Sequence, residues 1–397
     1  MKRFLLFATA AAAAMTLLCT KAFAELTQKY PCSDGMVLQQ CTSALVWGHG
    51  DAGRTVKVQT SWNGKSYAAK VDAQGVWRVN VTTPAASYRH HRISVRCGKE
   101  SCDINDVLVG EVWVASGQSN MEMPLRGFYN CPVENSNYVT ANPAGADKVR
   151  MFTVGINPQV EPVDDVAITR GWEKAVPATV AEMSATAYFF AEQLNRTLDV
   201  PVGILSLPRG GARLESWLPR ATVESFGTEN CDPSYVATVE PEYLRPYLVY
   251  NGMEQPVKGY TARGFIWYQG CHNAREAHRY CEKMHALYDG WAEKFGNPDL
   301  KLYYAQLADY KDGSHVALRL QQAKFEKEEP HAAMAVTSDT GIFEDIHSPD
   351  KQIVGTRLAL KALKRDYGFA IEDSSPEVKD LPYRTAIFSR LPSALNF

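Results

Sequence analysis

The chain has 397 residues, of which 45% are hydrophobic and 22% charged, and its formal net charge at neutral pH is −2. This composition is typical of a globular protein, and no run beyond the N-terminus is apolar enough to span a bilayer. A net charge so close to zero gives no overall positive potential that would attract nucleic acid, so nucleic acid is excluded as a partner. Because no later run is apolar enough, no membrane span is expected.

The first 24 residues have the pattern of a cleavable secretory signal. Lys2 and Arg3 precede an apolar run that ends at Leu18, and small residues flank Phe23 at the expected cleavage site. The run is shorter than the 18 or more residues of a spanning helix. Cleavage after Ala24 would remove three cations and no acid, which takes the formal charge from −2 to −5. We therefore expect export, to the periplasm or the medium.

Cysteine usage agrees with an oxidising compartment. Eight cysteines remain after the signal, at positions 32, 41, 97, 102, 131, 231, 271 and 281. An even number in an exported protein indicates disulfides, and Cys97 with Cys102 is the first pairing to expect, because Gly98 to Ser101 could turn a hairpin. Free buried thiols are the alternative. No cysteine and histidine spacing resembles a closed zinc site, so neither a metal nor a cofactor is expected.

Residues 25–106 offer short alternating runs separated by glycine and asparagine turns. The clearest are Val56 to Thr60, Val76 to Val81 and Ile93 to Val95. Such spacing predicts a small antiparallel β-sandwich domain.

From residue 107 to about 370, apolar runs alternate with amphipathic stretches. We expect strands at 112–115, 202–207, 264–268, 302–307 and 333–337, and helices near 185–198, 278–295, 318–328 and 350–367. The repeated alternation predicts an α/β domain whose mostly parallel sheet is covered on both faces, with reactive groups where strands end. Residues 121–183 show few clear periods and are expected to form long loops around a pocket. Residues 371–397 form an atypical tail.

Ser119 is the first candidate for chemistry. The buried strand predicted at 112–115 leads into Ser116, Gly117, Gln118 and Ser119, a turn that would display the last serine. Met121 stands where the second glycine of an α/β-hydrolase nucleophile elbow would be, so this is a different arrangement. A structural alternative is that Ser119 only caps the following helix.

His347 is the best-placed base for this serine. A serine hydroxyl needs a base to take its proton, and His347 lies between a late strand and a helix, next to Glu344 and Asp345. Either carboxylate could orient the imidazole. The order serine, acid, histidine is one of several in which such triads occur.

Four separated blocks resemble the SGNH hydrolases, and within them the sialate O-acetylesterase group, which is related to the acetylxylan esterases of carbohydrate esterase family 6. The blocks are residues 116–124, residues 210–217 with Gly210, Gly211 and Trp217, residues 266–273 from Ile266 to Asn273, and residues 345–357 from Asp345 to Arg357; Val37 to Gln39 resembles the N-terminal signature. The resemblance implies a three-layer α/β/α (flavodoxin-like) catalytic domain, here residues 107–370, preceded by a β-sandwich.

The same resemblance implies two-step acyl transfer. Ser119 would attack the acetyl carbonyl while His347 takes its proton. The oxyanion donors would be the Ser119 amide, a Gly210 or Gly211 amide and the Asn273 side chain. Asp345 matches the family's last block and is the expected third member, Glu344 is the alternative, and a dyad is also possible. Some relatives carry that acid at the position of Cys271, which this chain cannot use.

The expected substrate is an acetylated sugar or glycan, most closely O-acetylated sialic acid. Residues expected at the substrate are Gln118, Arg213, Trp217, Gln269 and His272. Arg213 or Arg126 could bind a sialic acid carboxylate, and Phe128, Trp217, Trp267 and Tyr268 could stack on the ring. Acetylxylan or another acetylated polysaccharide is the alternative substrate, and a carbohydrate-binding protein without catalysis is the rival class.

Overall fold

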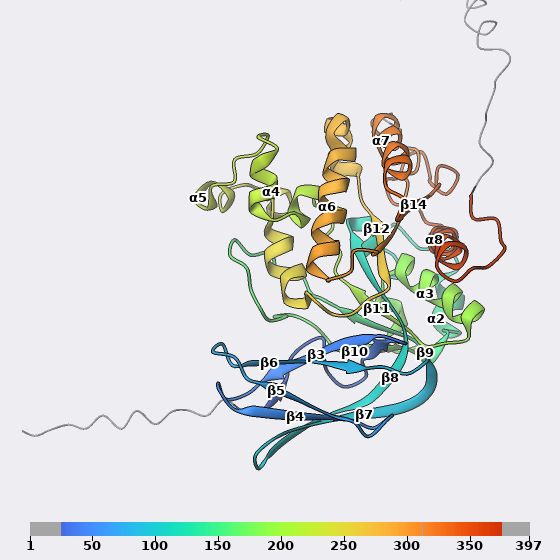
Figure 1. Cartoon of the computed structure of the whole chain (residues 1–397). Coiled ribbons are helices and arrows are strands. Elements are labelled where there is room, and N and C mark those ends of the chain that lie inside the picture. Colours follow the sequence, from blue (N-terminus) through green and yellow to red (C-terminus); the bar gives the residue numbers. More distant parts are fainter. Residues whose placement is uncertain (1–24, 312, 375–397) are drawn as a thin grey trace, which may run out of the picture.

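The N-terminal part of the described chain consists of short strands. The computed structural model describes residues 25–311 and 313–374, so the predicted signal (1–24) and most of the predicted tail (375–397) lie outside the described residues. The first strands are β1 (Thr27–Gln28), β2 (Val37–Gln39), β3 (Ser43–His49), β4 (Thr55–Thr60), β5 (Ser66–Lys70), β6 (Val76–Thr82), β7 (Ser87–Cys97) and β8 (Glu100–Gly117). One sheet has the order β1-β3-β6, while β4 pairs with β5 and β7, and β7 pairs with β8, all antiparallel. These strands gather at the bottom of Figure 1.

Strand β8 joins the two parts of the molecule. Its first half pairs with β7, and its second half enters the large sheet, where β2 also lies parallel to it. Asp106 has a left-handed φ of 56° at the transition. The predicted boundary between residues 106 and 107 thus falls within one continuous strand.

The large sheet carries the C-terminal part of the chain. It runs β10-β9-β11-β8-β12-β13-β14, and every neighbouring pair is parallel except β10 with β9. Its further strands are β9 (Gly145–Thr153), β10 (Trp172–Ala175), β11 (Val202–Ser206), β12 (Gly264–Tyr268), β13 (Lys301–Ala305) and β14 (Ala332–Ala335). The core strands are fully buried, as their unbroken apolar runs require.

The helices match the predicted periods closely. The longer ones are α3 (Ala185–Leu198), α6 (Tyr280–Lys294), α7 (His315–Glu328) and α8 (Lys351–Arg365); the shorter ones are α1 (Ser119–Glu122), α2 (Ser136–Ala141), α4 (Arg220–Ser225), α5 (Pro233–Val236), η1 (Val180–Glu182), η2 (Leu214–Trp217), η3 (Glu242–Leu244), η4 (Tyr250–Glu254), η5 (Gln255–Val257) and η6 (Cys271–Arg279). Side-chain caps fix the starts of two of the longer helices: Ser184 accepts from the Ala187 amide at 3.2 Å, and Asp350 accepts from the Ile353 amide at 2.9 Å. Helices α3 and α8 pack together, as do α6 and α7. In the described ranges, no helix is both long enough and apolar enough to cross a membrane.

The segment predicted as long loops contains two strands, which corrects that prediction. The sequence pattern does not predict strand β9, because charged residues interrupt its apolar run. Arg150 is fully buried there, where its guanidinium donates to the Gly35 carbonyl at 2.8 Å and to Asp106 and Asp147 oxygens at 3.0 Å. A cation paired in this way can occupy a core strand although its residue type indicates surface.

The cysteines correct the disulfide prediction. All eight cysteines of the described chain are free thiols. The hairpin between β7 and β8 exists, but its register places Cys97 opposite Glu100 and Cys102 opposite Val95. The two thiols are therefore offset along the ladder and do not face each other, which is the reason that the hairpin is not bridged.

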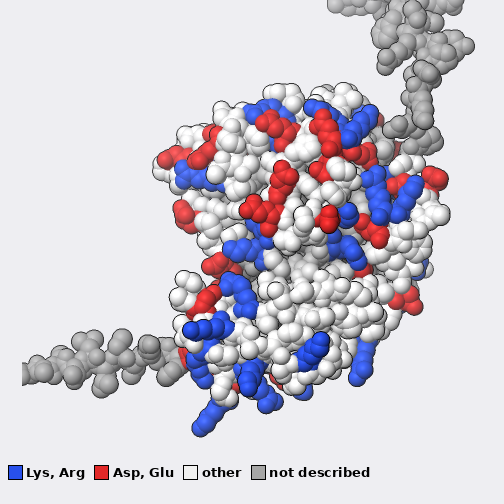
Figure 2. All heavy atoms as spheres, viewed as in Figure 1, with Lys and Arg blue, Asp and Glu red and all other residues white. Residues whose placement is uncertain are grey.

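Charge is mixed over the visible surface. In Figure 2, basic and acidic side chains are interspersed over the helical part, and lysine and arginine prevail over the strands at the bottom. No single-sign field covers the helical part on this face.

Candidate active site

Ser119 lies where β8 ends and α1 begins, at the carboxyl edge of the parallel strands. Gly117 makes this turn possible: its φ is +133°, and a Cβ there would collide with the Tyr268 carbonyl. Gln118 fixes the turn to the loop after β12, because its side-chain oxygen accepts from the Gly270 and Cys271 amides at 2.8 and 3.0 Å. These contacts hold the backbone before Ser119 in place at the end of β8.

His347 meets this serine from the loop before α8. Its Nε2 lies 3.0 Å from Ser119 Oγ, which is hydrogen-bonding distance. Asn120 holds the loop by donating to the Ile346 carbonyl at 3.0 Å, and the Phe128 ring packs edge-on against the imidazole. The fold therefore brings the predicted serine and histidine, which are 228 positions apart in the sequence, into contact.

The surroundings keep His347 neutral. Burial lowers its pKa below the ordinary value of 6.5, the nearby Lys351 ammonium lowers it further, and the Asp345 carboxylate opposes both. A neutral imidazole can accept the serine proton near neutral pH.

Asp345 is the carboxylate beside the histidine. One of its oxygens lies 3.6 Å from His347 Nδ1 and accepts from the His347 amide at 2.8 Å, while the Cys131 thiol lies 3.1 Å from the other oxygen. The 3.6 Å separation gives an electrostatic contact rather than a hydrogen bond. Glu344 is exposed to solvent. Of the two acids left open by the sequence, Asp345 is therefore the one that lies beside the imidazole, at a distance that allows an electrostatic contact.

Lys351 is a buried amine close to this site. Its ammonium contacts the Asn120 side-chain oxygen and lies 5.3 Å from the centre of the Tyr268 ring. Burial lowers the pKa of Lys351 to about 7. The contact with Asn120 couples the first turn of α8 to α1, and so helps to hold the histidine loop against the serine.

The serine and the histidine open into a cleft of about 520 Å³. It is lined by Gln118, Ser119, Phe128, Arg209, Gly210, Gly211, Tyr243, Cys271, His272, Ile346 and His347. This volume is in the range of small-molecule sites.

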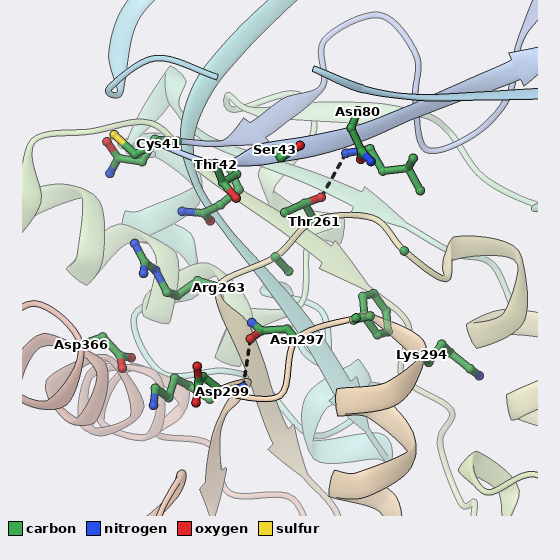
Figure 3. A pocket seen from close by; sticks show the side chains of 18 of the residues that line it. Cys41, Thr42, Ser43, Asn80, Thr261, Arg263, Lys294, Asn297, Asp299 and Asp366 are labelled. Atoms are coloured by element: carbon green, nitrogen blue, oxygen red, sulfur yellow. Dashed lines mark hydrogen bonds between the residues drawn. The ribbon is translucent and has the colours of Figure 1, made fainter. Parts of the chain in front are cut away.

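A larger cavity of about 1030 Å³ lies elsewhere, between the N-terminal strands and the amino ends of β12 and β13. Figure 3 shows its polar lining, which includes Thr42, Asn80, Arg263, Asn297 and Asp299. Its described lining holds no histidine, so no serine and histidine pair exists there, and size alone does not identify the reactive site.

The structure places some of the predicted oxyanion donors at the cleft and gives others a protein partner or a place outside it. Ser119 is the first residue of α1, where amides have no intrahelical partner, and Gly211 lines the cleft with a φ of +76° that suits glycine. The Gly210 amide, however, donates to the Glu122 carboxylate. Burial raises the pKa of Glu122. Asn273 is the clearest departure, because its side chain is buried outside the cleft.

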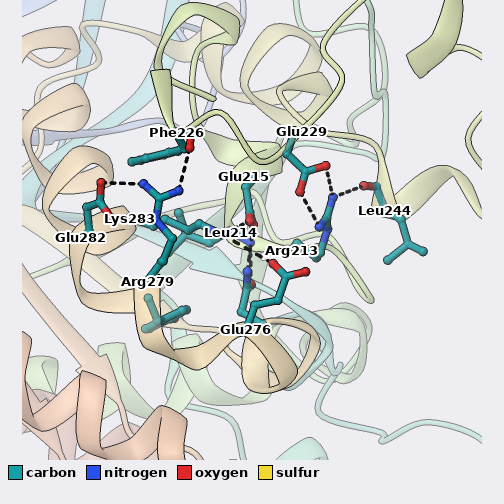
Figure 4. Close-up of polar contacts among 12 residues, drawn as sticks. Arg213, Leu214, Glu215, Phe226, Glu229, Leu244, Glu276, Arg279, Glu282 and Lys283 are labelled. Atoms are coloured by element: carbon teal, nitrogen blue, oxygen red, sulfur yellow. Dashed lines mark hydrogen bonds and ion pairs between the residues drawn. The ribbon is translucent and has the colours of Figure 1, made fainter. Parts of the chain in front are cut away.

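Asn273 belongs to a buried polar network beneath the second block. It donates to Glu215 at 2.9 Å and accepts from the Leu214 amide at 2.9 Å. Glu215 is fully buried and pairs with Lys283. Burial alone would raise the pKa of Glu215, but the charges of Lys283 and Arg213, together with hydrogen bonds from Lys283 and Asn273, outweigh burial and lower the pKa. This network, drawn in Figure 4, supports the loop rather than the reacting atoms.

The predicted substrate residues are also divided by the structure. Gln118 and His272 line the cleft, and the His272 ring lies 5.6 Å from that of Tyr243. Trp217 is buried and packs edge-on against Trp267.

Gln269 is likewise buried and donates to Asn273 at 2.8 Å. Arg213 forms a two-point pair with Glu229 at 2.7 and 2.8 Å. The structure therefore corrects the prediction that places Trp217, Gln269 and Arg213 at the substrate. Each of these side chains is held by protein partners away from the cleft.

Sequence reasoning missed two residues of the cleft. Arg209 directly precedes the Gly210 block, and that adjacency was a usable signal. Tyr243 comes from η3, more than 30 residues further along the chain, and nothing local in the sequence marks it.

Among residues 25–311 and 313–374, three groups of side chains have ligand atoms that lie within 4.8 Å of one another, close enough to share a metal ion. They are Cys131, Asp345 and His347; Cys281, His285 and Glu328; and Glu215, Glu229 and Glu276. In the second group Cys281 and His285 bond Glu328 at 3.2 and 3.3 Å, and in the third Lys283 and Arg213 neutralise the acids. The first group contains His347, the candidate base, and proton transfer by a histidine needs no metal.

Comparison with known proteins points to one class of enzyme. A family described as carbohydrate esterase, sialic acid-specific acetylesterase, matches residues 109–364. The chain is 28% identical to a sialate O-acetylesterase of Rattus norvegicus, over 84% of this chain and 72% of the relative, and 28% identical to one of Homo sapiens, over 85% and 70%. It is also similar to the crystal structure of a carbohydrate acetylesterase from Xanthomonas citri, with 32% identity, a TM-score of 0.79, and coverage of 88% and 78%.

Proposed function

Because the chain belongs to the sialic acid-specific acetylesterase family of carbohydrate esterases, and is therefore a carboxylic ester hydrolase, we propose that it removes O-acetyl groups from sialic acid by acyl transfer through Ser119. The observation that carries this proposal is the 3.0 Å contact between Ser119 Oγ and His347 Nε2 at the wall of a cleft. A serine and a neutral imidazole in this geometry form the reacting pair of serine esterases.

The proposed mechanism has two steps. His347 takes the Ser119 proton while the oxygen attacks the acetyl carbonyl, and the sugar alcohol leaves with that proton. Water, deprotonated by His347, then releases acetate and restores the serine. Asp345 stabilises the imidazolium that forms in each step from its position 3.6 Å away. The Ser119 and Gly211 amides are the proposed donors to the oxyanion.

We propose the SGNH arrangement for the catalytic part and a β-sandwich for the strands before it. The parallel strand order supports the first, together with the packing of α3 against α8 and of α6 against α7. In Figure 1, α6 lies on one side of the strands, and α3 and α8 lie on the other. The antiparallel pairs β1 with β3, β3 with β6, β4 with β5 and β4 with β7 support the second. We also propose export, which the N-terminal pattern supports and which sequencing of the mature N-terminus would test.

The test is acetate release from O-acetylated sialic acid and from acetylated xylan by the purified protein. Release from sialic acid with little from xylan supports the proposal. Release from xylan alone would replace sialic acid with a polysaccharide as the substrate, and no release from either by a folded protein would favour a carbohydrate-binding role.

A further inference from the structure

Arg209 is the only lysine or arginine among the described residues that line the cleft. Its backbone is fixed where β11 ends, since its amide donates to the Gly117 carbonyl at 2.8 Å. The next residue, Gly210, is close to the serine: a Cβ built on it would lie 3.7 Å from Ser119 Cβ. A single cation is thus anchored a short distance from the proposed nucleophile.

The guanidinium of Arg209 is incompletely paired. Its Nη2 lies 3.3 Å from the half-exposed Glu242 carboxylate, and its Cζ lies 5.9 Å from the centre of the Tyr243 ring. Its Nε is buried and has no hydrogen-bond partner in the described part of the chain. Arginine carries five N–H donors, and buried donors are rarely left unsatisfied, so this group has capacity for a ligand.

The other arginines considered for such a role are occupied. Arg213 is held by both oxygens of Glu229. Arg126 donates to Glu182 at 2.7 Å and to the Gly127 carbonyl at 3.0 Å, and it lines a separate depression of about 320 Å³. Within the described residues, only Arg209 therefore combines a place in the cleft with free donors.

We propose that Arg209 forms a carboxylate-binding subsite, which holds the acid group of a sugar acid while the acetyl ester lies at Ser119. This inference rests on the proposed esterase function. An arginine fork matches a carboxylate through two parallel hydrogen bonds, and the exposed single contact with Glu242 is weak competition. The rings of Tyr243 and His272, 5.6 Å apart, form the adjoining wall for the sugar. A neutral sugar would leave the arginine without its counter-charge.

The experiment compares two substrates that differ only in this charge: O-acetylated sialic acid and its carboxyl methyl ester. For the wild-type protein, kcat/KM for acetate release is expected to be about 10- to 100-fold higher for the acid, the range of a charge-assisted hydrogen-bonded pair. Arg209→Met is expected to reduce this ratio to roughly threefold or less, mainly through KM. Arg209→Lys keeps the charge but not the fork and should retain part of it.

Arg126→Met is the matched control, because it removes an arginine beside the cleft but outside its lining; its ratio should equal that of the wild type. A wild-type protein that cleaves both substrates equally well would overturn the carboxylate subsite and leave the esterase function intact. Failure to cleave either substrate would overturn both proposals. If Arg209→Met does not fold, the wild-type ratio and the ratio of Arg209→Lys still test the subsite. Loss of the preference in Arg126→Met would also refute the assignment to Arg209.

Discussion

Asp345→Asn tests which acid assists His347. The change removes the negative charge but keeps an oxygen that can accept from the His347 amide, now 2.8 Å from the carboxylate. Two readouts should change. The rate should fall because the imidazolium loses its counter-charge, and the pKa of His347 should fall further because Asp345 is the group that raises it.

The contact distance sets the size of the effect. At 3.6 Å, Coulomb's law gives about 1 kcal/mol in water and about 5 kcal/mol at an effective dielectric constant of about 20. The side chains of His347 and Asp345 are 24% and 36% exposed, so solvent screening favours the lower part of this range. We therefore expect kcat/KM to fall by roughly 10- to 100-fold, less than the roughly 10⁴-fold loss seen when a hydrogen-bonded triad acid is replaced.

The assay is acetate release as a function of pH, with Glu344→Gln as the control. Asp345→Asn should lower the plateau and move the acid limb to lower pH, whereas Glu344→Gln, which changes an exposed side chain, should do neither. The reasoning is refuted if Glu344→Gln causes the larger loss, or if the limb of Asp345→Asn moves to higher pH.

Three further predictions concern pH and packing. Because burial and Lys351 lower the pKa of His347, the acid limb of wild-type kcat/KM should lie below pH 6.5; a limb above neutrality would contradict this. Gly355→Ala places a Cβ 2.7 Å from helix α3 and should lower the free energy of unfolding in urea by about 1–3 kcal/mol, whereas Gly290→Ala, with open space around it, should not destabilise. Lys283→Met leaves Glu215 buried without its cation and should cost about 3–5 kcal/mol at neutral pH. Because the pKa of Glu215 is lowered in the folded state, its pairing with Lys283 stabilises the protein above the ordinary pKa of a glutamate, and this stabilisation is lost as the pH falls. An equal cost of Lys283→Met at acid pH would contradict the pairing.

The sequence predicted those parts of the fold in which local pattern and tertiary environment agree. Helix α3 was expected at 185–198 and strand β12 at 264–268, and both have these limits, because one has a continuous amphipathic period and a serine cap and the other is an apolar run buried on both faces. Strand β9 could not be predicted in this way, since the pairing of Arg150 with acids distant in sequence makes its burial possible. Disulfide formation depends on strand register, which the spacing of Cys97 and Cys102 does not reveal.

The candidate site was predictable to a similar degree. Sequence blocks identified the loops that meet at the cleft, and Ser119 and His347 do come together. The blocks did not reveal side-chain direction: Asn273 points into a buried network, and the guanidinium of Arg213 faces Glu229. Tyr243 reaches the cleft from a distant turn, and only the folded chain shows it.

The most direct test of the central claim is to trap the acyl-enzyme. The wild-type protein would be mixed with O-acetylated sialic acid, quenched in acid within one turnover, digested and analysed by mass spectrometry. The account predicts one added acetyl group on the peptide that contains Ser119, absent from Ser119→Ala, which should also release no acetate. An acetyl adduct on another residue, or undiminished acetate release by folded Ser119→Ala, would contradict it.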